Sequence, residues 1–214
     1  MLSYLRSDTD LFTILKEDNR CKILSPKDTE QTISVDTSVD KGEIVFKVIV
    51  IGDGSVGKTT LLRQYVEHQF ETEYIPTVGV NILKEQIEVN GKTVNLMLWD
   101  IAGQPQFYLL HKVYYNGANG VILMFDLTNS PSFTNVNNWY NELIKYGLDV
   151  VPIIMCGNKA DLKAERKIIE PMAHSKMEQL GVPAYFETSA KEGTNVKEAF
   201  NKIIELMMSR KKFN

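Results

Sequence analysis

The strongest chemical signal in the sequence is the run Gly-Asp-Gly-Ser-Val-Gly-Lys-Thr at residues 52–59, the phosphate loop, which fits G-x-x-x-x-G-K-[ST]. Glycine lets backbone N–H groups approach phosphate oxygens without a Cβ in the way, and a helix beginning near Gly57 adds its positive dipole end. Lys58 would supply charge to the outer phosphates, and the Thr59 hydroxyl is suited to ligating Mg²⁺. The residues expected to bind the phosphates are Gly54, Ser55, Val56, Gly57, Lys58, Thr59 and Thr60.

A second polar run, Gly-Asn-Lys-Ala-Asp at residues 157–161, could select the base of a bound nucleotide. A carboxylate such as that of Asp161 can accept from the ring N–H and the exocyclic amine of guanine, a pair of donors that adenine lacks. The wrong base would leave that carboxylate unpaired, at a cost of about a few kcal/mol. The pattern N-K-x-D alone also occurs in surface turns, but together with the phosphate loop it favours guanine.

The elements that position these runs alternate regularly after residue 42. Apolar stretches predict strands at residues 44–51, 82–89, 93–99, 120–125, 151–156 and 184–186. Asn90-Gly91 joins the second and third of these strands and favours a two-residue hairpin. Helices are expected up to residue 66 and over residues 130–144, 169–180 and 196–207. The first of the three full helices would have one apolar face, formed by Phe133, Val136, Tyr140, Leu143 and Ile144. The second is marked by Ile169, Met172, Ala173, Met177 and Leu180. In the last helix the inward side chains would be Val196, Phe200, Ile203, Ile204 and Met207, with Met208 at the solvent edge.

This alternation predicts an α/β fold, in which a six-stranded, mostly parallel sheet has helices on both faces. The hairpin makes one strand antiparallel, and we expect that strand at the edge of the sheet. Ligands of such folds lie beyond the carboxyl ends of the strands, and both polar runs directly follow a predicted strand.

The first 42 residues differ from the rest of the chain in charge and polarity. Residues 1–40 contain five basic and eight acidic side chains, and residues 25–42 are polar enough to be a flexible linker. Upstream, Leu2, Leu5, Leu11, Phe12, Ile14 and Leu15 could form a short amphipathic helix, serving as a tail packed on the domain or as an anchor. We therefore expect a partly disordered extension and linker at residues 1–42 and one folded domain at residues 43–212.

Composition excludes several classes of protein. The 214 residues are 43% hydrophobic with a net charge of −3, which argues against nucleic-acid binding. No run reaches the roughly 18 apolar residues of a membrane-spanning helix, and the opening residues do not look like a signal peptide. Two cysteines favour a reducing, cytoplasmic compartment, with Cys156 packed in a strand. His68, His111 and His174 are scattered, so no metal or catalytic role is expected for them.

Together these motifs resemble the small GTPase superfamily of Ras-like proteins, over residues 43–210. The run Tyr-Ile-Pro-Thr-Val-Gly at residues 74–79 matches the family's first switch segment, and Trp-Asp-Ile-Ala-Gly-Gln at residues 99–104 matches its second. Residues 188–191, Thr-Ser-Ala-Lys, match the base loop that packs on guanine. The resemblance implies the P-loop GTPase fold.

The resemblance also implies roles for single residues. Thr77 would bind Mg²⁺ with Thr59 and sense the terminal phosphate, while Asp100 would be an outer-shell or water-mediated metal partner. Gly103 would donate its N–H to that phosphate, and Gln104 would position the attacking water, so the catalytic set is Gln104, Lys58 and Thr77. Further nucleotide contacts are implied for Phe70, which would stack on guanine, and for Tyr74, Asn158, Lys159, Asp161, Ser189, Ala190 and Lys191.

Within the superfamily the chain is most similar to the Rab-like branch, through residues 77–81, 114–118 and 125–128. It departs from that pattern at Ile82, where an aromatic is usual, and at Pro105-Gln106 after the switch glutamine. The sequence ends without a cysteine and with three nearby basic residues, so neither prenylation nor a lipid-binding basic cluster is expected. Membrane recruitment would then need the extension or a partner.

The resulting hypothesis is a Rab-like switch that hydrolyses GTP slowly in trafficking or signalling. It would be a monomer with Mg²⁺ as cofactor and an exchange factor, an activating protein and effectors as partners. One alternative is a non-catalytic scaffold that holds GTP, and another is an ATP-using kinase or transporter subunit. Gln104 and Thr77 favour the enzyme over the scaffold, and Asp161 opposes the use of ATP.

Overall fold

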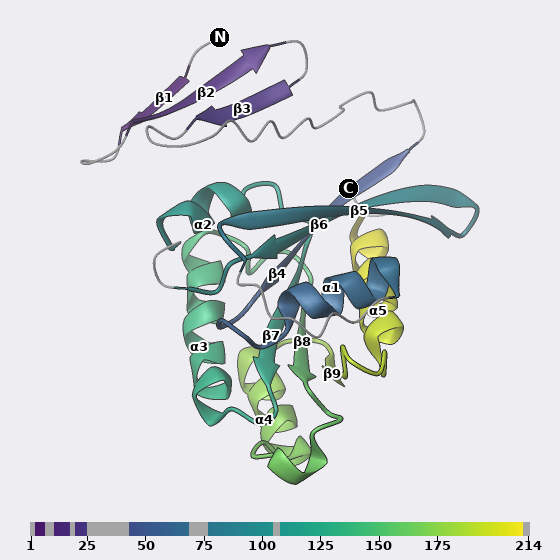
Figure 1. Cartoon of the computed structure of the whole chain (residues 1–214). Coiled ribbons are helices and arrows are strands. Elements are labelled where there is room, and N and C mark those ends of the chain that lie inside the picture. Colours follow the sequence, from purple (N-terminus) through teal and green to yellow (C-terminus); the bar gives the residue numbers. More distant parts are fainter. Residues whose placement is uncertain are drawn as a thin grey trace. The chain divides into compact units, whose positions relative to one another are not determined.

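The computed structural model describes residues 3–6, 11–17, 20–24, 43–68, 77–104 and 108–211, with side chains from residue 43 onward. The chain divides into two units, Met1–Glu43 and Ile44–Asn214, and each contains its own sheet (Figure 1). In these ranges no helix is both long and apolar enough to cross a membrane.

The first unit is an antiparallel sheet of three strands, β1 (Ser3–Arg6), β2 (Leu11–Glu17) and β3 (Arg20–Leu24), in the order β1-β2-β3. The amphipathic helix considered for this segment is therefore wrong. Phe12, Thr13 and Ile14 favour strands because β-branched and aromatic side chains lose rotamer freedom in a helix. Pairing of Glu17 with Arg20 leaves a two-residue connection. The linker predicted at residues 25–42 lies outside the described residues.

The second unit is built on a six-stranded sheet in the order β5-β6-β4-β7-β8-β9. The pair β5–β6 is antiparallel and every other pair is parallel, so the predicted sheet with one antiparallel edge strand is confirmed. Its strands are β4 (Ile44–Ile51), β5 (Val80–Val89), β6 (Lys92–Ile101), β7 (Gly120–Asp126), β8 (Ile153–Asn158) and β9 (Tyr185–Glu187).

Helices cover both faces of this sheet, and alternate residues of β4 enter two separate cores (Figure 1). Val48 and Val50 pack with α1 (Lys58–Glu67) and α5 (Val196–Lys211). Ile49 and Ile51 pack with the other three helices. These are α2 (Tyr108–Tyr115), α3 (Ser130–Lys145) and α4 (Glu170–Leu180), and a 3-10 turn, η2 (Lys163–Glu165), precedes α4.

The helix faces differ in part from the prediction. On α3, Trp139 is buried while Ile144 is 46% exposed, because the buried stripe runs through positions 132, 136, 139 and 143. On α4, Ala173 is the one fully buried residue and Met172 is exposed, as is Ile169 just before the helix. Met208 is buried rather than at the solvent edge. The short helix α2 was not predicted, since its eight residues make little more than two turns and are too few for a repeated pattern.

The packing of α1 against α5 can be tested at Phe200. Its ring is fully buried and stacks on Tyr65, with centroids 3.8 Å apart. Phe200→Ala should lower the free energy of unfolding by about 3–5 kcal/mol, because it leaves a cavity in the core. Denaturant titration of the purified protein measures this change. Leu109→Ala is the control, since a side chain 88% exposed should change stability by less than about 0.5 kcal/mol. Equal effects of the two substitutions would contradict this account of the core.

Candidate functional site

The phosphate loop connects the carboxyl end of β4 to the start of α1. Gly57 precedes α1 with φ of 98°, and no side chain caps the helix, so its first N–H groups remain available to an anion. A Cβ at Gly57 would overlap the amide nitrogen of Asn158, and one at Gly52 would overlap the Met124 carbonyl oxygen. Glycine is thus required here by conformation and by close approach to β7 and β8.

Lys58 places a buried positive charge under this loop. The side chain is 6% exposed, and its Nζ donates to the carbonyl oxygens of Gly52 and Asp53, both at 2.7 Å. Burial lowers the pKa of Lys58 to about 8, although the charges of Asp100 and Asp53 act in the opposite direction. The site therefore holds an ammonium group that a phosphate anion would stabilise.

Two threonines converge on the carboxylate of Asp100 at the end of β6. Thr59 Oγ1 donates to Asp100 Oδ2 at 2.5 Å, Thr77 Oγ1 donates to the same oxygen at 3.1 Å, and the two hydroxyls lie 2.9 Å apart. Asp100 is 1% exposed, and its Oδ1 is buried without a hydrogen-bond partner. Burial raises the pKa of Asp100, opposed by the Thr59 hydrogen bond and the charge of Lys58.

This oxygen cluster fits a hard divalent cation. Hydroxyl and carboxylate oxygens are Mg²⁺ ligands, and Mg²⁺ commonly completes its shell with water and phosphate. Across the described ranges no three His, Cys, Asp or Glu side chains gather as a metal site, so a purely protein-made cage is not present there. An orphaned carboxylate oxygen beside two hydroxyls is the arrangement that a cation would complete.

The second switch segment lies directly against the phosphate loop. A Cβ at Gly103 would overlap the Gly52 carbonyl oxygen and lie 2.6 Å from Lys58 Nζ. A Cβ at Gly54 would be 3.8 Å from Gln104 Cγ, which is ordinary contact. The Ala102 N–H donates to the carbonyl of Gly79 at 3.0 Å and so links the two switch segments. The structure thus brings Gly103 and Gln104 to the loop.

The residues predicted to select the base meet at the carboxyl end of β8. Asn158 Nδ2 donates to the Val56 carbonyl at 2.9 Å, while its Oδ1 accepts from the Ala190 N–H at 3.1 Å. Asn158 therefore ties the phosphate loop to the base loop. Asp161 Oδ1 accepts from Ser189 Oγ at 2.7 Å, which fixes the orientation of the carboxylate.

The other predicted residues are distributed as follows. Lys159 forms an ion pair with Asp126 at 2.7 Å, and Lys191 is exposed next to the buried Ala190. Phe70 and Tyr74 lie outside the described residues. Asp126 was missed, although its position at the end of β7 could have indicated it.

A salt bridge next to the base loop could not be predicted from the sequence. Arg166 pairs with Glu187 through two hydrogen bonds of 2.7 Å, and Glu187 directly precedes the base loop. The bond to Arg166 lowers the pKa of the Glu187 carboxyl. These partners are 21 positions apart, so no local pattern marks the pair.

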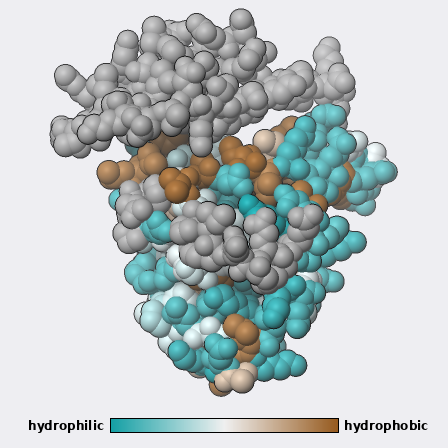
Figure 2. All heavy atoms as spheres, viewed as in Figure 1, coloured by the Kyte–Doolittle hydropathy of each residue, from teal (hydrophilic) through white to brown (hydrophobic). Residues whose placement is uncertain are grey.

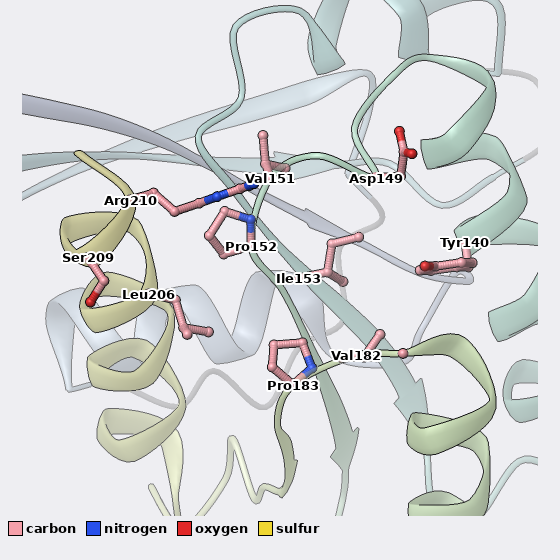
Figure 3. A pocket seen from close by; sticks show the side chains of 11 residues that line it. Tyr140, Asp149, Val151, Pro152, Ile153, Val182, Pro183, Leu206, Ser209 and Arg210 are labelled. Atoms are coloured by element: carbon pink, nitrogen blue, oxygen red, sulfur yellow. The ribbon is translucent and has the colours of Figure 1, made fainter. Parts of the chain in front are cut away.

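A separate cavity of about 390 Å³ lies at the amino end of β8, whereas the candidate site lies at the carboxyl end. Figure 3 shows apolar side chains of this cavity, including Ile153, Val182 and Leu206, between α5 and the end of α3. No residue of the candidate site lines it.

The chain is similar to known proteins over most of its length. Residues 47–209 match the model of the Ras family, a range that contains the phosphate loop, both switch segments and the base loop. The GTP-binding protein YPTM1 of Zea mays is 41% identical over 158 residues, 74% of this chain and 76% of the relative. The Ras-related protein RABD2c of Arabidopsis thaliana is 40% identical over 74% of this chain and 78% of its own. The Ras-related protein Rab-13 of Mesocricetus auratus is 39% identical over the same shares.

Titration of Lys58 should make nucleotide affinity depend on pH. Bound phosphate favours the charged lysine and raises its pKa above the value of about 8 set by burial. The affinity for GDP should therefore be independent of pH below about pH 8, where Lys58 is charged in the free protein. Above about pH 8 the affinity should fall by up to about tenfold per pH unit. Equilibrium titrations between about pH 7 and pH 9 measure this slope.

Lys58→Gln is the matched control. It removes the titrating lysine, so that any remaining pH dependence of the affinity comes from the nucleotide itself. It should bind GDP more weakly at pH 7 and lack the lysine-dependent slope. Identical slopes in the two proteins would contradict the role of this lysine.

Proposed function

The chain belongs to the Ras family, and we propose that it is a Rab-like molecular switch that binds guanine nucleotide with Mg²⁺ and hydrolyses GTP. The observation that carries the proposal is the convergence of a buried ammonium group, an uncapped helix start and an orphaned carboxylate oxygen at one place. These are a charge, a set of N–H donors and a cation ligand, which are the parts that a triphosphate with Mg²⁺ requires.

Mg²⁺ would be held by the hydroxyls of Thr59 and Thr77, with Asp100 as a ligand through water. When bound, the ion would neutralise charge on the phosphate oxygens. The hydrogen bonds from both threonines to Asp100 orient these side chains in advance. Thr77 lies in the first switch segment, so its release on loss of the terminal phosphate would free that segment.

Hydrolysis in this chemistry depends on positioning and charge stabilisation rather than on covalent catalysis. Lys58 and the Gly103 N–H would stabilise charge on the terminal phosphate, and Gln104 with the Thr77 carbonyl would orient the attacking water. Residues 69–79 and 99–107 contain no arginine. Intrinsic turnover should therefore be slow, and an activating protein that supplies an arginine could add about 10³–10⁵-fold.

The switch segments also offer a surface for effectors. Val78 in the first segment is 81% exposed, and Leu109 on α2 after the second is 88% exposed. Figure 2 shows hydrophobic residues gathered over α2 and the neighbouring strands. Because both segments would respond to the terminal phosphate, partners that cover this surface would distinguish GTP from GDP.

In the cell we infer a cytoplasmic monomer that acts in trafficking or signalling and reaches membranes through a partner. An exchange factor would load GTP and an activating protein would end the signal. A scaffold that only holds GTP would have no use for Gln104 beside the phosphate loop.

Gln104→Leu tests the hydrolytic role directly. With GTP and Mg²⁺ bound, single-turnover phosphate release should be at least about tenfold slower than in the wild type, since the water loses its positioning group. GTP affinity should change little. The control is Gln86→Leu, which makes the same change on β5, where Gln86 donates to Asn95 at 3.3 Å. Equal hydrolysis rates in all three proteins would contradict the proposed role of Gln104.

A further inference from the structure

One face of α3 contacts the phosphate loop. Asn135, Trp139 and Glu142 are spaced by four and three residues, which places them on the same side of the helix. Asn135 Nδ2 donates to Asp53 Oδ2 at 2.8 Å, and Trp139 Nε1 donates to Asp53 Oδ1 at 2.7 Å. The carboxylate of Asp53, and with it the loop carbonyl that accepts from Lys58, is therefore fixed to α3.

The same face of α3 contacts the second switch segment through a buried histidine. His111 on α2 is fully buried, with Nδ1 2.8 Å from Glu142 Oε1 and Nε2 3.4 Å from the Ala102 carbonyl oxygen. Its ring stacks on Tyr115, with centroids 5.3 Å apart, and lies 5.4 Å from the ring of Trp139. Packing on two sides leaves the imidazole little freedom to turn away from these two oxygens.

The Ala102 carbonyl is half of a peptide unit whose other half is the Gly103 N–H. A trans peptide is planar, with C=O and N–H pointing in opposite directions, so fixing one fixes the other. His111 holds the carbonyl on the α2 side of this unit. The N–H of Gly103 is then directed to the opposite side, and Gly103 itself abuts the phosphate loop and Lys58.

We propose that His111 is a positioning residue for GTP hydrolysis, which Glu142 orients so that it sets the Ala102–Gly103 peptide for the terminal phosphate. Gln104 follows this peptide directly, so its main chain is set by the same contact. The inference rests on the proposed function of Gly103 and Gln104. It makes α3 the common support that holds the phosphate loop and the second switch segment at a fixed separation.

Glu142 is necessary to this arrangement because it makes the shorter of the two contacts of the ring. Glu142 Oε1 holds the Nδ1 side of the imidazole and so directs Nε2 to the Ala102 carbonyl oxygen. Among the described residues, the other titratable groups near the ring are Tyr115, whose hydroxyl lies 3.5 Å from Nδ1, and Tyr108, whose ring centroid is 5.1 Å away. Neither offers a negative charge in the neutral pH range.

His111→Phe tests the proposal, since it keeps an aromatic ring in the stack and removes both ring nitrogens. With GTP and Mg²⁺ bound, single-turnover hydrolysis should slow about fivefold, as expected for loss of one hydrogen bond of typical strength. GDP affinity should stay within about twofold, because Lys58 and the helix start are untouched. A residue with only a packing role would leave the rate of the folded, nucleotide-bound protein unchanged.

Two further variants keep the test informative if His111→Phe folds poorly. Glu142→Leu changes a side chain that is 20% exposed, and it should slow hydrolysis about as much as His111→Phe does. The double variant should be no slower than either single one, because the two residues act through one contact. Tyr140→Phe is the control, since it removes a hydroxyl from α3 at the separate cavity, and it should hydrolyse GTP at the wild-type rate.

Gln104→Leu is measured in the same series to separate the two claims. If Gln104→Leu is slow while His111→Phe and Glu142→Leu match the wild type, the positioning role is wrong and the proposed function stands. If the Gln104→Leu rate equals that of the wild type, the proposed function itself is contradicted. Additive losses in the double variant would also overturn the single-contact account.

Discussion

The structure of the candidate site depends on keeping one ammonium group charged and almost fully out of water. Lys58 lies under the phosphate loop, where burial opposes its charge and two carbonyl oxygens hold it. Only a loop without side chains at Gly52 and Gly57 can turn its carbonyls and N–H groups this closely around it. Gly103 has the same requirement, since any side chain there would displace the ammonium group. The glycines and the lysine thus form one physical constraint.

The sheet brings the parts of this site together from distant points in the sequence. Strands β4, β6 and β8 end at the same edge, and the phosphate loop, the second switch segment and the base-selecting run follow them in turn. Hydrogen bonds from Asn158 and to Asp100 then connect these loops. A buried carboxylate oxygen without a hydrogen-bond partner costs stability, and the proposed role of Asp100 in cation binding would account for it.

Much of this could be predicted from the sequence, because buried strands and the phosphate loop have local patterns. The antiparallel pair followed from Asn90-Gly91. The helix α2 was too short to be predicted, and the strand β2 was mistaken for a helix. The contacts that set the site's geometry join residues far apart: Asp53 and Trp139 are 86 positions apart, and His111 and Glu142 are 31 apart. Composition and spacing contain no information on such pairs, since tertiary packing alone brings them together.

The central claim is that the phosphate loop and the distant carboxylate of Asp161 bind one guanine nucleotide. It is tested by measuring the affinities of the wild type and of Asp161→Asn for GDP, ADP and xanthosine diphosphate. Ser189 holds that carboxylate in place, so the wild type should prefer GDP over ADP by about 100-fold or more. An asparagine amide donates where the carboxylate accepts, so Asp161→Asn should favour the xanthine base, which has a carbonyl in place of the amine. Equal affinity of the wild type for GDP and ADP, or an unaltered preference in Asp161→Asn, would contradict the account.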